Sequence, residues 1–409
     1  MKFAVLRSVV LGGLLALARG AGGSEPTAEQ TCRFLRQSGA NLPWIHYGWD
    51  LGANPWGGAA DGFSSNRAAL ASAFAALRGN RATLCRVFLF GDCRSGLLYD
   101  GFGGVSGAEP LAYTDMDAIV AEARTAGVRL LPVLLDFMVA DGVATNQDGV
   151  LLGEHPELIA DPRRKRQFIE NVVRPFVRRY GTNEAIYAWD ILNEPSFASA
   201  VTTNDLKQFV EDCAAAILSE NPGARVTFGN YDRYDLEAYG AATCTAAQVH
   251  YYDFAMSCYW DFDAPATNIL ASKPVLFGEV EATNAADKLQ AALTNGYEGV
   301  LFWSVRAPFN GSDFGTVADA YHRWAAVALA DACRMLSITS VRLSDSQVRL
   351  DIWPTFEGLR YRVERSAAPG PGAWQSVGEF GGAAGTNRAS VLVSIPAGEG
   401  VFYRVRADL

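Results

Sequence analysis

The sequence has few of the residues from which metal centres are built. It contains 4 histidines and 7 cysteines in 409 residues. No two cysteines form a Cys-x-x-Cys pair, and the histidines (46, 155, 250 and 322) are scattered without the Cys/His spacing of a zinc site. We therefore expect neither a metal ion nor another cofactor.

An excess of positive charge is also missing. Lys and Arg number 35 against 44 Asp and Glu, which gives a formal net charge of -9 at pH 7. Proteins hold phosphate backbones mainly through clustered Lys and Arg. The composition thus disfavours nucleic acid as a partner.

The chain has no apolar run long enough to span a bilayer. The most apolar stretch is Ser8 to Ala18, interrupted at Gly12 and Gly13, whereas a membrane helix needs roughly 20 residues. It follows the basic residues Lys2 and Arg7 and precedes small residues. This is typical of a secretory signal peptide, predicted at residues 1–23. We expect a secreted or periplasmic protein without membrane insertion, in which the seven cysteines could form up to three disulfides of undetermined pairing.

Apolar, β-rich runs alternate with amphipathic helical runs over most of the chain, which indicates a parallel α/β fold. Strands are predicted at residues 44–47, 83–88, 129–135, 186–192, 225–228, 248–251, 275–278 and 300–303. Helical runs are predicted at residues 65–78, 115–126, 162–180, 204–219, 284–294 and 319–335. Eight strands favour a (β/α)8 TIM barrel over residues 24–336, with a doubly wound open sheet as the alternative.

From residue 337 to residue 409 the pattern changes to short alternating runs separated by Gly, Pro and Ser turns. This predicts a small C-terminal all-β sandwich domain of the fibronectin or immunoglobulin type. Trp353 and Trp374 could bind polysaccharide there, although single tryptophans in small sandwiches more often belong to the core.

Two predicted strands end in a carboxylate. One runs from Ala188 to Asn193 and is followed by Glu194 and Pro195, and the other leads from Pro274 to Glu279. Counted along the chain, these are the fourth and the seventh strands. In a β/α barrel the active site lies at the C-terminal ends of the strands, so both glutamates are candidate catalytic residues.

Two carboxyl groups are what glycosidic cleavage requires. One protonates the departing oxygen, and the other attacks the anomeric carbon or activates water. A separation of about 5 to 5.5 Å gives retention of configuration, whereas roughly 6.5 to 9.5 Å gives inversion. The sequence does not supply this distance.

The segments 189–195 and 274–279 resemble the acid/base and nucleophile motifs of glycoside hydrolase family 5, the cellulase and β-mannanase family of clan A. Further family positions have matches in the expected order: Arg86 on the second strand, His250 and Tyr252 on the sixth, and Trp303 on the eighth. The resemblance therefore covers the whole barrel.

The resemblance implies a retaining double displacement with Glu279 as nucleophile and Glu194 as general acid/base. It further implies that Asn193 hydrogen-bonds the sugar 2-hydroxyl, and that Arg86 and Tyr252 keep Glu279 ionised and oriented. His250 would donate to the sugar or to Glu194. Trp303 would offer an apolar face to the sugar at the cleavage site, unless it is a core residue at the barrel end.

The match departs from the family at one position. The family usually has a histidine after the third strand, where this chain has Asp136 and Phe137. This leaves clan A intact but admits a sister family, including enzymes that act on β-1,3-glucans. Glu281 is the competing nucleophile candidate, and Asp190, inside the barrel, is expected to have a structural role.

Export and an abundance of loop aromatics favour an endo-acting enzyme that cleaves β-linked polysaccharide, either β-1,4-mannan or β-1,4-glucan. We expect the protein to be a monomer. Trp49 and Trp260 are candidates for flanking subsites. Two alternatives stay open: an exo-acting β-glycosidase or β-1,3-glucanase of a sister family, and a non-catalytic polysaccharide-binding protein.

Overall fold

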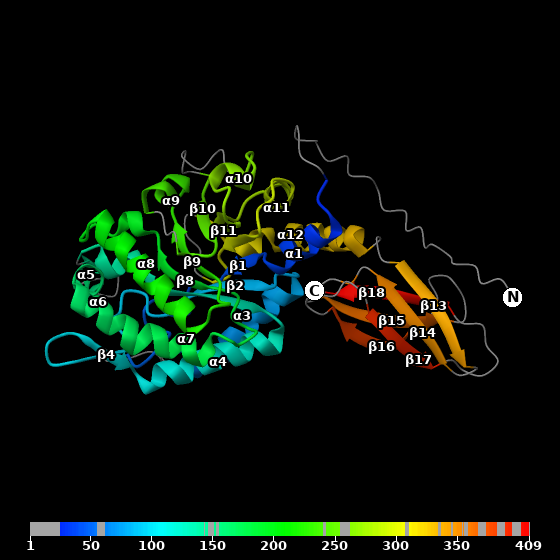
Figure 1. Cartoon of the computed structure of the whole chain (residues 1–409), viewed down its shortest axis with the longest axis horizontal. Helices are drawn as coiled ribbons and strands as arrows, with labels where there is room; N and C mark the ends of the chain where they lie inside the picture. Colours follow the sequence, from blue (N-terminus) through cyan, green and yellow to red (C-terminus); the bar gives the residue numbers. More distant parts are fainter. Residues whose placement is uncertain are drawn as a thin grey trace. The chain divides into compact units, whose positions relative to one another are not determined.

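The computed structural model shows two compact units, one spanning Arg33–Ala326 and the other containing the segment from Val327 onward (Figure 1). The signal-peptide prediction, Trp260 and Cys258 lie outside the residues that the structure describes. The described residues are 25–54, 62–142, 144–145, 151–152, 155–239, 243–253, 262–306, 311–333, 337–344, 347–353, 355, 359–366, 374–382, 389–394 and 402–408.

The larger unit is a closed barrel of eight parallel strands, which confirms the predicted fold class and excludes the open sheet. The strands occur in sequence order around the barrel. They are β1 (Gly39–Asn41), β2 (Leu84–Phe88), β5 (Arg129–Asp136), β8 (Trp189–Asn193), β9 (Val226–Asn230), β10 (Ala247–Tyr251), β11 (Val275–Glu281) and β12 (Val300–Trp303).

The predicted first strand was wrong. Residues 44–47 carry the stronger apolar signal, but the strand is the short segment Gly39–Asn41, whose small residues give little indication of a strand. The stretch after it is a loop held by the buried carboxylate of Asp50, which accepts hydrogen bonds from the backbone N–H groups of Ile45 (2.6 Å) and His46 (3.1 Å). Aromatic residues in this loop therefore lie at the C-terminal end of the barrel.

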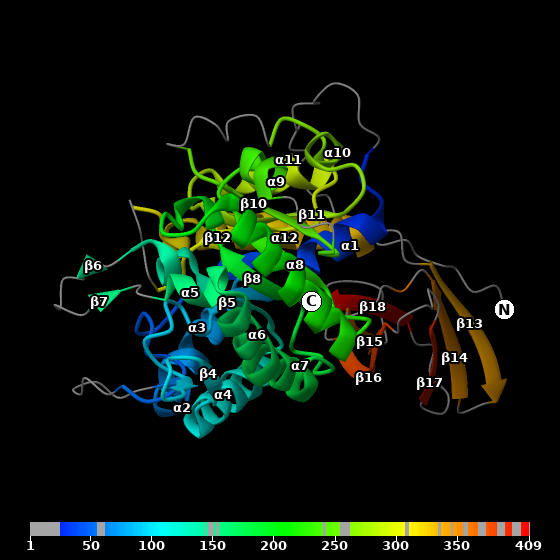
Figure 2. The same ribbon diagram turned by 60° about the vertical axis from the view of Figure 1, so that its left-hand side comes forward.

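Helices surround the barrel (Figures 1 and 2). They are α2 (Gly62–Ser65), α3 (Arg67–Gly79), α4 (Pro110–Ala126), α5 (Pro156–Ala160), α6 (Pro162–Phe168), α7 (Arg174–Tyr180), α8 (Thr203–Glu220), α9 (Arg233–Tyr239), α10 (Ala266–Ile269) and α11 (Ala285–Thr294). A π-helical turn, η2 (Ile169–Val173), joins α6 to α7, so the helix predicted at residues 162–180 is continuous but not regular. Helices α1 (Ala28–Arg36) and α12 (Phe314–Cys333) lie near the two ends of the described barrel sequence.

Two long stretches that follow barrel strands contain short elements. The stretch after β2 carries the hairpin of β3 (Leu97–Tyr99) and β4 (Val105–Ala108), and the stretch after β5 carries η1 (Phe137–Ala140) and the strands β6 (Ala144–Thr145) and β7 (Leu151–Leu152). A short helix, η3 (Pro195–Phe197), follows β8.

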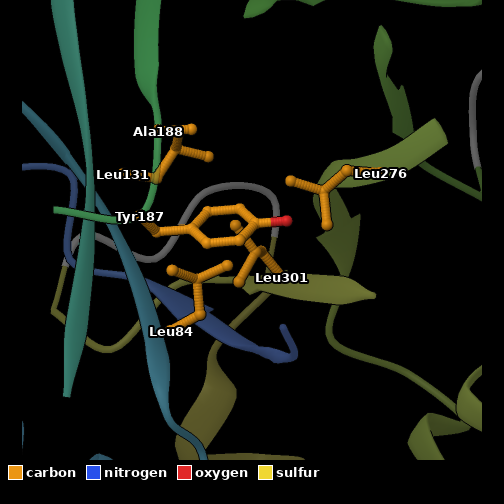
Figure 3. Packing of buried hydrophobic residues seen from close by; sticks show 6 residues of the cluster. All are labelled: Leu84, Leu131, Tyr187, Ala188, Leu276 and Leu301. Carbon is orange, nitrogen blue, oxygen red and sulfur yellow. The ribbon is translucent and has the colours of Figure 1, made fainter. Parts of the chain in front are cut away.

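Apolar side chains fill the N-terminal half of the barrel. Figure 3 shows the cluster around the ring of Tyr187, which consists of Leu84, Leu131, Tyr187, Ala188, Leu276 and Leu301. The four leucines lie in the first halves of four barrel strands, and Tyr187 and Ala188 directly precede β8. Burying them removes apolar surface from water and stabilises the strand arrangement.

The C-terminal segment forms two antiparallel sheets, in the orders β13-β14-β17 and β16-β15-β18. The strands are β13 (Ser337–Ser344), β14 (Gln347–Trp353), β15 (Arg360–Ser366), β16 (Gln375–Gly381), β17 (Ala389–Ser394) and β18 (Phe402–Asp408). Leu350 of one sheet and Val363 of the other belong to the same buried cluster, as a sandwich requires. The ring of Trp374 is half-buried with the Arg404 guanidinium 4.3 Å from its centre, and the side chain of Trp353 lies outside the described residues.

Four of the cysteines that might have paired are buried thiols: Cys85, Cys93, Cys213 and Cys244. Burial raises the pKa of the Cys85 and Cys244 thiols to about 12, so they stay protonated and unreactive. The expectation of disulfides is thus not met at these positions. Among the described residues, no helix is long and apolar enough to cross a membrane.

Candidate active site

The C-terminal ends of five barrel strands bring the predicted site residues together. Glu194 follows β8 and Glu279 lies in β11, which are the fourth and seventh barrel strands, as predicted. Arg86, His250 and Trp303 lie on β2, β10 and β12, and Tyr252 directly follows β10. The spacing of the motifs along the chain therefore corresponds to their order around the barrel.

The backbone at Glu194 adopts a conformation that L-residues rarely use. Its φ is 44° and its ψ is 62°, in the left-handed region, and its N–H donates to the carbonyl of Gly229 (2.8 Å). Such strain is tolerated where the surroundings impose it, often at functional sites. The strand ends at Asn193, and the turn that follows directs the Glu194 side chain toward β10.

A β-bulge at Gly278 presents Glu279. The pairing of β10 with β11 shifts register here, so that Val249 opposes Phe277 while His250 opposes Glu279. Bulges often re-aim a side chain beside an active site. A Cβ at Gly278 would lie 2.4 Å from Cδ of Gln248, which explains why the Gly278-Glu279 step of the motif needs glycine.

Glu279 is buried and accepts two hydrogen bonds. Arg86 Nη1 donates to Oε1 (2.6 Å), and the Tyr252 hydroxyl donates to Oε2 (2.6 Å). Burial raises the pKa of Glu279, while the Arg86 charge and the Tyr252 hydrogen bond act in the opposite direction. Both partners fix the carboxylate and favour its ionised form.

Arg86 is itself held by three further residues, one of which is Asn41, whose Oδ1 accepts from Nη1 (3.4 Å). Its Nε donates to Asp190 Oδ2 (2.8 Å) and its Nη2 to Asn193 Oδ1 (2.8 Å), and both Arg86 and Asp190 are fully buried. Asp190 also accepts from Gln248 Nε2 (2.7 Å) and from the Gly229 N–H (3.1 Å). The structural role predicted for Asp190 is confirmed, since it compensates the buried guanidinium.

Glu194 forms a hydrogen bond with His250. His250 Nδ1 lies 2.7 Å from Glu194 Oε1. Burial lowers the pKa of His250 to about 4, so its ring is neutral at neutral pH and can donate from Nδ1 when Glu194 is ionised. Glu194 therefore keeps a partner in the form that acts as a base.

The pKa of Glu194 is raised to about 7. Burial is the largest contribution, the Arg86 charge opposes the shift, and the carboxylate of Asp235 adds to it. A carboxyl group with a pKa near 7 can both give and take a proton at neutral pH.

The two glutamates are close together. One carboxylate oxygen of Glu194, one of Glu279 and a ring nitrogen of His250 all lie within 4.8 Å of one another. This spacing agrees with the shorter separation of retaining enzymes and is less than the separation with which inverting enzymes admit a water between the carboxyl groups. The same three atoms are close enough to hold a cation, so the expectation of no cofactor stays a prediction.

Glu281 is separated from this network. Its Oε2 accepts from the backbone N–H of Asp253 (2.7 Å), and neither Arg86 nor His250 bonds to it among the described contacts. Of the two candidates on β11, Glu279 is thus the one placed beside Glu194.

The predicted tryptophans differ in their placement. Trp303 is only 7% exposed, and its ring meets that of Trp44 edge to face at 5.9 Å. Trp49 is half-buried in the loop after β1, with the Arg94 guanidinium 5.4 Å from its ring. Neither has a described contact with the catalytic glutamates, so their roles toward a sugar stay predictions.

Several residues of the site were missed from the sequence. Asn41 donates to the Gly278 carbonyl (3.0 Å), Gln248 holds Asp190, and Tyr47 donates to Asp136 Oδ2 (2.7 Å). Gln248 lies two residues before His250 on the same strand, so the two side chains point to the same face. This spacing could have identified Gln248 as a site residue. Asn41 and Tyr47 had no such signal, because the first strand was misplaced.

A row of aromatic rings begins beside Glu194. The ring of Phe197 lies 5.3 Å from that of Phe137 and 5.2 Å from that of Tyr231. Phe197 and the nearby Tyr234 are 42% and 49% exposed, respectively. Exposed rings of this kind offer faces on which sugars can stack.

No protein-family model matches the sequence. A mannan endo-1,4-β-mannosidase from Mytilus edulis is 23% identical over 318 residues, covering 65% of this chain and 83% of that protein. The crystal structure of an endo-1,4-β-mannanase from Eisenia fetida has a TM-score of 0.58 at 19% identity, covering 70% of this chain and 90% of that one. A β-1,4-D-mannanase from Cryptopygus antarcticus has a TM-score of 0.59 at 18% identity, with coverages of 70% and 89%.

The resemblance to clan A glycoside hydrolases is confirmed. The solved structures show that the barrel of this chain is the fold of such enzymes. The sequence relative and both solved structures are β-1,4-mannanases.

Proposed function

We propose that this protein is a retaining endo-β-1,4-mannanase, with Glu194 as general acid/base and Glu279 as nucleophile. The observation that carries the proposal is the spacing of the two carboxylates, whose oxygens come within 4.8 Å at the ends of the fourth and seventh strands. Each carboxylate has the partners that its role needs.

In the first step, the Glu279 carboxylate attacks the anomeric carbon while protonated Glu194 gives its proton to the departing glycosidic oxygen. The bond between the anomeric carbon and that oxygen breaks, and a covalent glycosyl-enzyme of α configuration forms. The pKa of about 7 keeps a substantial share of Glu194 protonated at neutral pH. Arg86 and Tyr252 orient Glu279 for attack and hold its negative charge.

In the second step, ionised Glu194 takes a proton from water, whose oxygen attacks the anomeric carbon. Glu279 leaves as a carboxylate, and the product has the β configuration of the substrate. His250 Nδ1 supports Glu194 at 2.7 Å while it is ionised. Apart from the substrate and this water, the two steps use only groups of the chain.

Mannan as the substrate is supported by the relatives. The similar proteins from Mytilus edulis and Cryptopygus antarcticus are mannan endo-1,4-β-mannosidases, and 83% and 82% of their lengths, respectively, align with this chain. The exposed rings of Phe197 and Tyr234 favour a polymer that extends past the cleavage point, and hence endo action.

The test is hydrolysis of linear mannan, cellulosic glucan, mixed-linkage glucan, β-1,3-glucan and xylan by the purified protein, with product sizes recorded over time. We expect mannan to be cleaved fastest, with oligosaccharides of mixed length appearing early and carrying a β-anomeric reducing end by NMR. Release of monosaccharide alone would mean exo action, and an initial α-anomer would contradict retention.

We further propose that residues 1–23 are a signal peptide and that the mature protein is exported as a monomer. The proposed domain limits are 24–336 for the barrel and 337–409 for the sandwich. The basic, apolar and small-residue segments of the N-terminus support export. N-terminal sequencing of protein recovered outside the producing cell, with light scattering of the same sample, tests both.

A further inference from the structure

Asp136 occupies the position at the end of the third barrel strand where the resemblance leads one to expect a histidine. In the register of β5 with β8, Asp136 directly opposes Asn193. Its side chain is buried, and its backbone N–H donates to the Gly91 carbonyl (2.9 Å). The residue is thus fixed beside the strand that carries the acid/base glutamate.

The carboxylate of Asp136 accepts two hydrogen bonds. Asn193 Nδ2 donates to Oδ1 (3.2 Å), and the Tyr47 hydroxyl donates to Oδ2 (2.7 Å). Burial raises the pKa of Asp136 to about 6, and the two hydrogen bonds oppose this shift. Glu194 and Asp92 are the other carboxylates that influence it, so the ionised form depends on its two donors.

These contacts determine which way the Asn193 amide points. Its oxygen accepts from Arg86 Nη2 (2.8 Å), while its nitrogen donates to Asp136. A flipped amide would put N–H against the guanidinium and oxygen against the carboxylate, and both contacts would be repulsive. Asp136 and Arg86 therefore hold one orientation from both sides.

The fixed orientation has a chemical consequence. An amide nitrogen carries two hydrogens, and Asp136 takes one of them. The second leaves Asn193 able to donate to a sugar oxygen. A histidine at position 136 could offer a donor in place of an acceptor and would not impose this orientation.

We propose that Asp136 is a positioning residue that, braced by Tyr47, fixes the Asn193 amide as a hydrogen-bond donor to the 2-hydroxyl of the sugar at the cleavage site. The proposal rests on the proposed function, because the sugar contact of Asn193 belongs to it. It adds a residue that acts on the transition state without touching the reacting atoms.

The experiment compares an aryl β-mannoside with its 2-deoxy analogue. Asp136→Ala should lower kcat/KM for the mannoside about ten- to hundredfold, the size expected when a buried polar partner is lost. The same variant should change kcat/KM for the 2-deoxy analogue less than about threefold, because the contact it supports is already missing. Equal losses on both substrates would overturn the proposal.

Two further variants sharpen the comparison. In an Asn193→Ala background, Asp136→Ala should add little to the loss on the mannoside, whereas additive losses would contradict coupling. Asp136→Asn should restore most of the activity, because its oxygen can accept from Asn193 while its nitrogen donates to Tyr47.

Asp115→Ala is the matched control. Asp115 is a buried aspartate of α4 that accepts from the backbone N–H groups of Gly52 (2.9 Å) and Ser64 (2.9 Å). Its loss should lower thermal stability yet affect both aryl glycosides alike. If Asp115→Ala also lost more activity on the mannoside than on the 2-deoxy analogue, a general loss of stability would be enough to explain the selective loss in Asp136→Ala.

A measurement without substrate separates this proposal from the proposed function. In the full-length protein with labelled asparagine, the side-chain amide NMR signals of Asn193 should move in Asp136→Ala and stay near their wild-type positions in Asp136→Asn. Unmoved signals would overturn the proposal, whatever the enzyme cleaves. Wild-type protein that cleaves neither mannan nor the mannoside would instead refute the proposed function.

Discussion

The two ends of the barrel use the same strands for opposite purposes. At the N-terminal end, Leu84 and Leu276 pack into an apolar cluster (Figure 3), whereas two or three residues later on the same strands Arg86 and Glu279 form a buried ion pair at 2.6 Å. Apolar burial at the N-terminal end stabilises the barrel. This stability offsets the cost of the buried charges and of the left-handed backbone conformation of Glu194 at the C-terminal end. Substitutions at the two ends should therefore separate activity from stability.

The largest effect is expected at Glu279. Glu279→Ala should reduce hydrolysis of an aryl β-glycoside by at least about 10⁴-fold, because no nucleophile is left for the first step. Azide, which is small enough to occupy the vacated space, should restore turnover and give an α-glycosyl azide, identified by NMR. Circular dichroism should show the fold retained.

For this nucleophile assignment, Glu281→Ala is the matched control. Glu281 lies two residues further along β11 and bonds to the Asp253 backbone. It should keep most of the activity and need no azide. If Glu281→Ala were the inactive variant and Glu279→Ala the active one, the assignment would be reversed.

Removing the acid should produce a smaller and more selective loss. Glu194→Ala should lower polysaccharide cleavage about 10²- to 10⁴-fold, while a dinitrophenyl β-glycoside should still form the glycosyl-enzyme, because its leaving group needs no proton. A burst of dinitrophenol in stopped-flow measurements checks this. Equal loss on both substrates would argue against the acid/base role.

The pH dependence follows from the same residue. The first step needs Glu194 protonated, so activity should decline above its pKa of about 7 and approach a tenfold loss per pH unit. On the acid side, activity should fall when Glu279 takes up a proton. The basic limb should be absent from the profile of Glu194→Gln on the activated glycoside, and a retained limb would assign it to another group.

The sequence contained enough information for the barrel and for the catalytic pair. Seven of the eight strands carry apolar runs, and two of these runs lead to a glutamate, which placed Glu194 and Glu279 on the fourth and seventh strands. The first strand, Gly39–Asn41, has no such run and was misplaced onto the aromatic loop that follows it.

What the sequence could not give are contacts that depend on register. The bulge at Gly278, which sets Glu279 opposite His250, arises from the pairing of β10 with β11. The bond between Tyr47 and Asp136 joins residues 89 positions apart. The raised pKa of Glu194 belongs to the same group, because it comes mainly from burial, and burial depends on the whole fold.

At the opposite end of the barrel, the expected effect is on stability. Leu301→Ala removes a fully buried side chain from the cluster and should lower the free energy of unfolding by about 2 to 5 kcal/mol. The kcat on mannan at 25 °C should stay close to that of the wild type. Leu392→Ala, at a 61% exposed leucine, is the control and should change stability by less than about 0.5 kcal/mol. A large loss of kcat in Leu301→Ala would show that the two ends are not independent.

The smallest effect expected is that of a chelator. Glu194, Glu279 and His250 could together hold a cation, but Arg86 and Tyr252 already donate to the two oxygens of Glu279. A divalent ion would have to displace these donors and lie next to a guanidinium that two buried carboxylates keep charged. Activity should therefore be unchanged after treatment with EDTA and after addition of calcium, magnesium or zinc. Loss of activity with EDTA, restored by one of these ions, would mean that the catalytic end works through a metal and not through its carboxylates alone.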